Sequence, residues 1–158
     1  MTRLPAPESV LSEELMLPLH QAKNLHRVAD VYLQNGKVAE ATESVRKILS
    51  LQFPDGAPEG EDVKLDARAR LAKLLIPQGK LDEALKVLDD GINGSTRESF
   101  FLSNVYTVKG EVLQAIAATL DDTDKEAAAR HRVQAIDALE TSIHIDRRLQ
   151  TQLEGVTP

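Results

Sequence analysis

The sequence has no cysteine and no tryptophan, and aromatic residues make up only 3% of its 158 residues. A chain without cysteine forms no disulfide framework and offers no thiolate nucleophile. Because aromatic side chains are so few, a binding surface must depend on polar and aliphatic groups. Apolar runs are short, which predicts that nothing spans a membrane, and residues 1–5 lack the apolar core of a secretory signal. We therefore expect a cytoplasmic location.

Basic residues are also fewer than acidic residues. The chain has 19 Lys and Arg residues against 25 Asp and Glu residues, and its net charge is -6. No cluster of basic residues offsets this balance. We therefore expect no binding to nucleic acid, whose phosphate backbone attracts basic surfaces.

Motifs for catalysis and metal binding are missing as well. There is no glycine-rich phosphate loop, no zinc-ligand spacing and no His-Glu-x-x-His. The four histidines fall on different predicted helices or faces. Asp121, Asp122 and Asp124 are not followed by the glycine and closing glutamate of a calcium loop. We therefore expect no catalytic residue, no metal and no cofactor, and we do not expect an enzyme.

What the chain does contain is a phrase that recurs at a fixed distance. Gly-Lys-Val-Ala-Glu-Ala at Gly36–Ala41 returns as Gly-Lys-Leu-Asp-Glu-Ala at Gly79–Ala84, and more faintly at Asp122–Ala127. The three Glu-Ala pairs are 43 residues apart both times, at positions 40, 83 and 126. Self-similarity at a period of tens of residues is typical of stacked helical repeat proteins, which usually hold partners.

Each copy of the phrase lies between two helical patterns. Before Gly36 and after it, apolar residues recur at the spacing of one helical face. Gly36 suits the left-handed residue that ends a helix, and Pro77 should end the matching helix of the second unit about a turn early. Loops are predicted at 54–60 and 91–96, and no period-2 run predicts a strand. The sequence therefore predicts an all-α protein.

The units resemble tetratricopeptide repeats. In that pattern large and small residues alternate so that two helices of a hairpin pack closely. The 43-residue spacing is similar to the longer-looped repeats of kinesin light chains, and Arg68 and Gly91 depart from the pattern. The resemblance implies a right-handed α-α superhelix of three hairpins, with an N-terminal helix and a long C-terminal helix. The residues that occupy the pattern positions of the family are Leu25, Val28, Ala29, Tyr32, Ala41, Val45 and Ile48 in the first repeat, and Arg68, Leu71, Ala72, Leu75, Ala84, Leu88 and Gly91 in the second.

The third unit is predicted to be an extended hairpin. Gly110 with Ala135, and Tyr106 with Leu139, share the midpoint 122.5, so each pair lies equidistant from the turn at Asp121 to Asp124. Each arm is then longer by about six or seven residues, which adds roughly 10 Å. The Ala-rich arms suit a tip with few tertiary contacts. The alternative is a plain 43-residue repeat, which would place His131 in the core.

The domain boundaries follow from these units. Residues 1–18 are predicted to form an N-terminal segment with a short capping helix from Pro7 to Leu17, with Val10, Leu11 and Leu15 inward and Pro18 opening the next helix. A dimer contact is the alternative role. The repeats are expected at about 19–53, 62–94 and 97–153, and 154–158 is expected to be a disordered tail. The end of the last helix should present a polar outer face, although a partner or self-association remains open there.

The resemblance also implies a binding surface, because the first helix of each tetratricopeptide repeat lines a groove. A clamp for chaperone C-terminal carboxylates uses Lys and Asn where this chain has His26 and Asp30, so that ligand is not expected. The groove positions that the family pattern implies are Lys23, His26, Asp30, Leu33, Asp66, Ala69, Lys73, Ile76, Asn104, Thr107, Glu111 and Gln114.

Three functions remain open. The first is a non-enzymatic adaptor or scaffold that binds a segment of another protein or a peptide in the groove. The second is a small chaperone for a secreted or aggregation-prone substrate, similar in architecture to the tetratricopeptide chaperones of type III secretion translocators, which often dimerise through the N-terminal helix. The third is an enzyme or enzyme subunit, which no motif supports. A homodimer is compatible with the first two.

Overall fold

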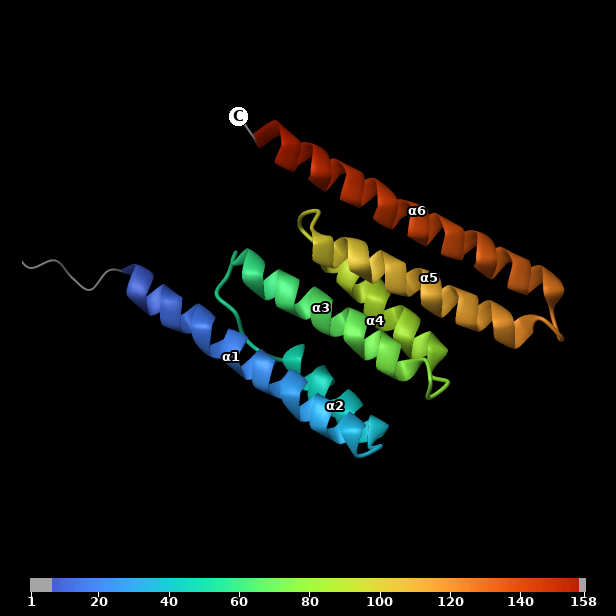
Figure 1. Ribbon diagram of the computed structural model, residues 1–158, viewed down its shortest axis with the longest axis horizontal. Coiled ribbons are helices and arrows are strands. Elements are labelled where there is room, and N and C mark those ends of the chain that lie inside the picture. Colours follow the sequence, from blue (N-terminus) through green and yellow to red (C-terminus); the bar gives the residue numbers. More distant parts are fainter. Residues whose placement is uncertain (1–6, 157–158) are drawn as a thin grey trace, which may run out of the picture. The chain divides into compact units, whose positions relative to one another are not determined.

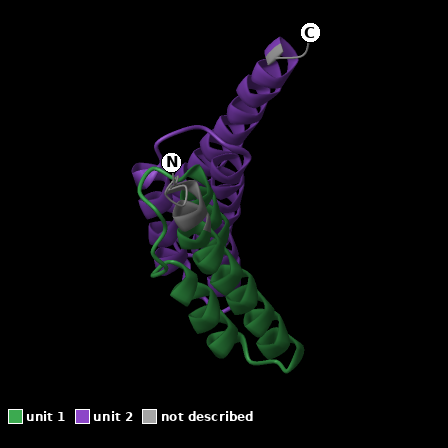
Figure 2. Ribbon diagram, turned by 90° about the vertical axis from the view of Figure 1, so that its left-hand side faces the viewer, with its two compact units in different colours: residues 1–67 green, residues 68–158 purple. Residues whose placement is uncertain are grey.

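The computed structural model describes the backbone of residues 7–156 and the side chains of residues 13–155. Over this range the chain is all-α, as predicted, with six helices and no strand (Figure 1). It divides into two compact units, residues 1–67 and 68–158, with α3 passing from one to the other (Figure 2). The helices are α1 (Pro7–Gln34), α2 (Val38–Ile48), α3 (Pro58–Leu75), α4 (Leu81–Gly94), α5 (Phe100–Leu120) and α6 (Lys125–Val156).

Two glycine turns confirm that the repeated phrase is a structural repeat. Gly36 and Gly79 have φ of 73° and 72°, a left-handed conformation that suits glycine. The next amide donates back to a carbonyl five residues earlier in each turn, Lys37 to Tyr32 at 2.8 Å and Lys80 to Leu75 at 3.1 Å. α3 ends at Leu75, as Pro77 predicts.

In the first unit α2 packs along α1 over small and branched side chains. Ala29, Ala41, Val45 and Ile48 are fully buried. The hydroxyl of Ser44 donates to the carbonyl of Leu25 at 2.7 Å, which ties α2 to the backbone of α1.

The predicted break at Pro18 is wrong, because α1 is one continuous helix of 28 residues with Pro18 inside it. Proline removes one helical hydrogen bond, but its ring is buried here and lies on the same helical face as buried Ala22 and Ala29. Apolar packing on that face outweighs the preference for a break. Leu15 is half-buried, whereas residues 1–6 and the side chains of Val10 and Leu11 lie outside the described part.

In the second unit α4 and α6 both pack along α5. A Cβ at Gly110 would lie 2.8 Å from Leu139 Cγ and 3.4 Å from the carbonyl oxygen of Ala135, so a larger residue would force the Leu139 side chain to shift. The predicted register of the extended hairpin is therefore confirmed. His131, the core residue of the plain-repeat alternative, is half-buried instead, with Nδ1 2.8 Å from the carbonyl oxygen of Ala127 on its own helix.

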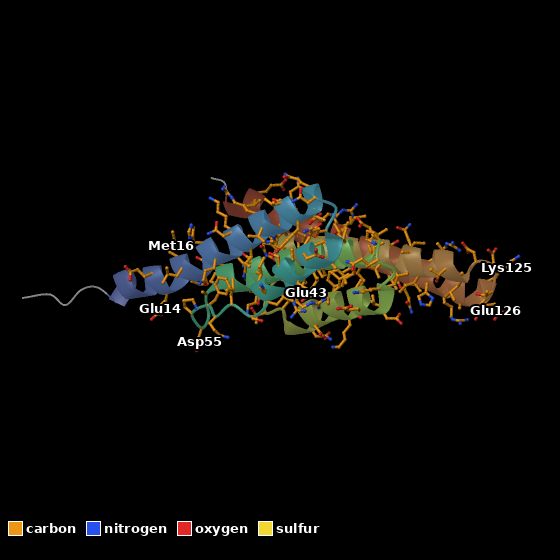
Figure 3. The ribbon with its side chains drawn as sticks, turned by 90° about the horizontal axis from the view of Figure 1, so that it is seen from below. Glu14, Met16, Glu43, Asp55, Lys125 and Glu126 are labelled. Carbon is orange, nitrogen blue, oxygen red and sulfur yellow. The ribbon has the colours of Figure 1, made fainter. Side chains whose placement is uncertain are left out.

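The tip of this hairpin is more tightly built than expected. Ala117, Ala127 and Ala128 are buried, so the prediction of few tertiary contacts there is wrong. Alanine lets the two arms approach closely as well as favouring helix. The Asp124 carboxylate caps α6 by accepting from the Ala127 amide at 3.0 Å. Figure 3 marks this end of α6 by Lys125 and Glu126.

α4 is longer than predicted, because it runs through Gly91 to Gly94 instead of entering a loop at residue 91. Gly91 is buried. Arg68 Nη1 donates to the carbonyl of Val87, one turn earlier on α4, at 2.9 Å. A glycine one turn later leaves that carbonyl uncrowded.

The predicted disordered tail is wrong for residues 154–156, which belong to α6. Residues 157 and 158 lie outside the described part. The last turns of α6 project beyond α5 (Figures 1 and 2), where Thr151 and Leu153 are exposed. Helical hydrogen bonds continue the helix that the hairpin has already formed, so no tertiary contact is required for these turns.

Candidate interaction site

The predicted groove residues of the first unit lie mainly on one face of α1. Lys23, His26, Asp30 and Leu33 follow one another at spacings of 3, 4 and 3. Lys23 and Asp30 are exposed, while His26 and Leu33 are half-buried. His26 Nε2 lies 3.9 Å from Oδ2 of Asp66 on α3, so the structure brings these two predicted residues together.

The predicted groove residues of the second unit differ in accessibility. Lys73 on α3 and Glu111 and Gln114 on α5 are exposed, whereas Asn104 is half-buried. Ala69 is buried and Ile76 is half-buried. Thr107 is half-buried and its hydroxyl lies 2.9 Å from Ser142 Oγ on α6. Thr107 therefore contributes to the α5–α6 interface.

A buried cluster of hydroxyl groups surrounds that contact. Ser103 Oγ lies 2.8 Å from Ser142 Oγ, and it also contacts the Asp146 carboxylate. Ser103 and Ser142 are both buried. Buried polar groups cost stability unless they are hydrogen-bonded, and each of these hydroxyls has a partner. The sequence signal was Ser142 at a position where the repeat pattern places alanine.

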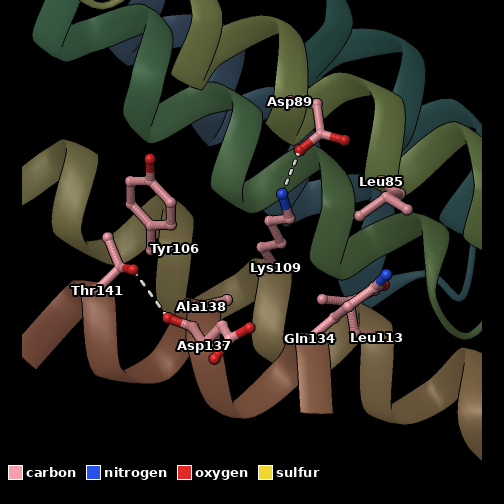
Figure 4. Close-up of a pocket in the computed structure, with 9 residues that line it drawn as sticks. All are labelled: Leu85, Asp89, Tyr106, Lys109, Leu113, Gln134, Asp137, Ala138 and Thr141. Carbon is pink, nitrogen blue, oxygen red and sulfur yellow. Dashed lines mark hydrogen bonds and ion pairs between the residues drawn. The ribbon is translucent and has the colours of Figure 1, made fainter. Parts of the chain in front are cut away.

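A hollow of about 450 Å³ opens between α4, α5 and α6 in the second unit (Figure 4). Leu85 and Tyr106 pack there against the buried cluster that contains Leu113 and Ala138. Its polar lining includes Asp89 and Lys109, which form an ion pair at 2.8 Å. The remaining lining residues are Gln134, Asp137 and Thr141. The hollow thus combines an apolar floor with groups that can orient a polar ligand.

Sequence reasoning missed this hollow because the family pattern pointed to another face of α5. At 3.6 residues per turn, Tyr106, Lys109 and Leu113 lie roughly opposite to Glu111 and Gln114. The available signal was Lys109, a charged residue at helical spacing from Tyr106 and Leu113. Its partner is on a different helix, which the local sequence does not reveal.

A second hollow, of about 530 Å³, lies between α1 and α2 in the first unit. Leu25, Val28 and Tyr32 line its α1 side, and Glu40 and Lys47 are among the residues on its α2 side. Val28 is exposed although it is apolar. This surface is also on a different face from the predicted groove residues of α1.

Three exposed ion pairs perturb the titration of their carboxyl groups. Hydrogen bonding from Arg132 lowers the pKa of Asp121, with both guanidinium–carboxylate contacts at 2.7 Å. Arg148 lowers the pKa of Glu98 in the same way, and Lys86 lowers that of Asp90. The first two pairs join α6 to residues at the two ends of α5. These shifts are those of structural ion pairs, and none belongs to a hollow or a predicted groove residue.

The described residues contain no group of three or more His, Asp or Glu side chains placed to hold a metal ion. Among the described helices, none combines the length and the apolarity needed to cross a bilayer. No protein-family model matches the sequence, and no curated protein matches it either.

Proposed function

We propose that this protein is a non-enzymatic adaptor or scaffold of the tetratricopeptide repeat type, which binds a segment of a partner protein. The observation that carries this proposal is the recurrence of one turn design, with left-handed Gly36 and Gly79 followed by buried Ala41 and Ala84. Arrays built from such units contact their neighbours through small residues and present the remaining helix faces to partners.

The exposed polar residues of the predicted groove support a role in recognition. Lys23 and Asp30 on α1 and Glu111 and Gln114 on α5 are exposed. We propose that each unit contributes its own part of the surface, with charges of both signs. Such charges favour specificity and association rate more than raw affinity.

The test starts from peptides selected on the full-length chain from a random display library. Binding of the best peptides is then measured to Lys23→Glu and Glu111→Lys, with Lys37→Glu and Asp122→Lys as charge-matched controls outside the predicted groove and both hollows. We expect groove variants to lose roughly tenfold in affinity, about 1.4 kcal/mol, and controls to stay within about twofold. Failure to enrich any peptide would contradict the adaptor proposal.

A further variant, Tyr106→Ala, separates the two faces of α5. Tyr106 lines the hollow of the second unit and lies away from the predicted groove residues. If only Tyr106→Ala weakens the selected peptides, the groove is the wrong surface and the hollow is the binding site.

One observation favours the chaperone alternative. Met16 and Leu17 are adjacent exposed apolar residues on α1, with Met16 labelled in Figure 3. Exposed apolar surface is used for holding unfolded substrates. Co-expression with an aggregation-prone secreted protein tests this function: the chain should raise the soluble yield, and Met16→Ser/Leu17→Ser should abolish the gain. An unchanged yield would remove the alternative.

A further inference from the structure

The long helix α6 has a second apolar face in addition to the one that packs on α5. Val133, Ile136 and Ile143 are 58%, 53% and 48% exposed. Their spacings of 3 and 7 place them on one side of the helix. Ala135 and Ala138 are buried and lie on roughly the opposite side of α6 from these three residues. We call the exposed row the α6 stripe.

The α6 stripe lies mainly in the middle of α6, whereas the end of the helix, where a polar outer face was predicted, exposes Arg147, Arg148 and Gln150. Single exposed apolar residues are common, but here three lie on one side of one helix, interrupted only by Glu140 between Ile136 and Ile143. The row continues at helical spacing through less apolar positions. From the N-terminal end it reads Glu126, Ala129, Val133, Ile136, Glu140, Ile143, Arg147 and Gln150.

We propose that the α6 stripe joins two copies of this chain as an antiparallel helix pair. Reversing the row about position 138 brings its two outermost large apolar residues together. Val133 then lies level with Ile143 of the second copy, and Ile136 with Glu140. Ala129 faces Arg147, whose aliphatic stem can cover a small residue. The two-fold axis repeats every one of these contacts, as an isologous interface requires.

Charge selects the antiparallel direction. In a parallel pair, Glu140 would face Glu140 and Arg147 would face Arg147, and like charges at facing positions destabilise such pairs. In the antiparallel pair, Arg147 lies level with Ala129 of the second copy, one turn from Glu126. Opposite charges therefore come together at both ends of the apolar contact.

The size of the α6 stripe predicts the strength of the dimer. Three exposed aliphatic side chains per copy form a small apolar centre, so the interface belongs to the weak, transient class. We expect a dissociation constant in the micromolar range. The monomer and the dimer should then be in exchange at ordinary working concentrations.

Sedimentation of the full-length chain tests the dimer. At about 100 µM the mass should approach twice 17.3 kDa. Ile136→Asp should raise the dissociation constant at least about tenfold, because it removes an apolar side chain and places a carboxylate level with Glu140 of the second copy. Leu153→Asp is the matched control on the same helix, since Leu153 is exposed by 71% but lies on a different face. A monomer at about 100 µM, or equal effects of both variants, would overturn the proposal.

Disulfide cross-linking tests the direction of the helix pair. The sequence has no cysteine, so the introduced cysteines have no competing thiol in the chain. A disulfide needs Cα atoms within about 7 Å. Val133→Cys and Ile143→Cys should cross-link when the two variants are mixed and oxidised. Neither should cross-link alone, because identical residues would be about 15 Å apart along the helices. Efficient self-cross-linking of Val133→Cys would show a parallel pair and refute the antiparallel arrangement.

Circular dichroism separates loss of association from loss of folding. Ile136→Asp and Leu153→Asp should retain the helical signal of the parent, since both positions are exposed. If Ile136→Asp unfolds, Ile143→Lys takes its place. Retained dimerisation in a folded stripe variant counts against the proposal.

Discussion

The first hairpin, α1 and α2, turns at a glycine, whereas the last hairpin, α5 and α6, has none in its turn. Residue 122, 43 positions after Gly79, is an aspartate. In the described residues only glycines have positive φ, so the last turn contains no left-handed residue. The Asp124 amide donates to Leu120 at 2.8 Å, and the Asp124 carboxylate caps α6. Side-chain capping thus replaces glycine where the left-handed conformation is costly.

The interiors of the two hairpins differ as well. α2 has 11 residues and uses one hydroxyl, Ser44, to reach the α1 backbone. α5 and α6 have 21 and 32 residues and meet through Gly110 and the cluster around Ser103. Two long helices pack closely along their whole length only where small residues recur at their interface, whereas a short hairpin needs one small residue.

The largest effect is expected from filling the close approach in the long hairpin. Gly110→Val places a branched side chain against Leu139, and such overpacking should cost about 3 kcal/mol of unfolding free energy. Chemical denaturation measures the loss. Gly94→Ala is the control, because its Cβ would meet nothing within 4 Å. Adding Leu139→Ala should recover part of the loss, and no recovery would contradict the contact.

A smaller loss should follow from removing a hydroxyl in each hairpin. Ser103→Val removes the contacts of the Ser103 hydroxyl with Ser142 and with the Asp146 carboxylate and leaves Ser142 only its contact with Thr107, which should cost about 2 kcal/mol. Ser44→Ala removes one bond to a carbonyl and should cost about 1 kcal/mol. Denaturation midpoints in urea compare the two, and equal losses would mean that the Ser103 cluster adds nothing beyond a single bond.

Substitutions in the turns should change the stability by less than those in the helix interfaces. Gly36→Ala and Gly79→Ala should each cost about 1 kcal/mol, because alanine is strained at positive φ. An added Cβ would meet nothing within 4 Å at either site, so the backbone alone accounts for the cost. Asp122→Gly, at the matching position of the last turn, should change stability by less than about 0.5 kcal/mol. Thermal unfolding measures all three, and a large stabilisation by Asp122→Gly would refute the distinction between the turns.

The weakest effect concerns pH at the tip of the long hairpin. Arg132 holds the pKa of Asp121 below its ordinary value by hydrogen bonding. The stabilisation is therefore complete above the ordinary aspartate pKa and is lost as the pH falls through the lowered value. In Arg132→Gln, the pKa of Asp121 measured by NMR titration should rise toward the ordinary value, and an unchanged pKa would exclude the pair. The exposed site makes the change in overall stability small.

The predictability of the fold differed from that of the binding surfaces. The apolar periodicity, Gly36 and Pro77 were sufficient to predict most of the helices and the two glycine turns, because they act through local backbone geometry. Pro18 misled the prediction because the burial of its face outweighs a local preference. The hollow beside Tyr106 was missed because its lining comes from three helices, and Lys109 gains its partner only when α4 packs beside α5.

By itself, the sequence determined the all-α class, the repeated glycine turns and the register of the long hairpin. These follow from periodicity and from small residues equidistant from a turn, which need no knowledge of distant contacts. Only the tertiary structure decided that Thr107 turns toward Ser142, that Arg68 reaches Val87 and that Val133, Ile136 and Ile143 stay exposed. Which face of a helix is covered depends on the neighbours it meets, and residues far apart in the chain supply them.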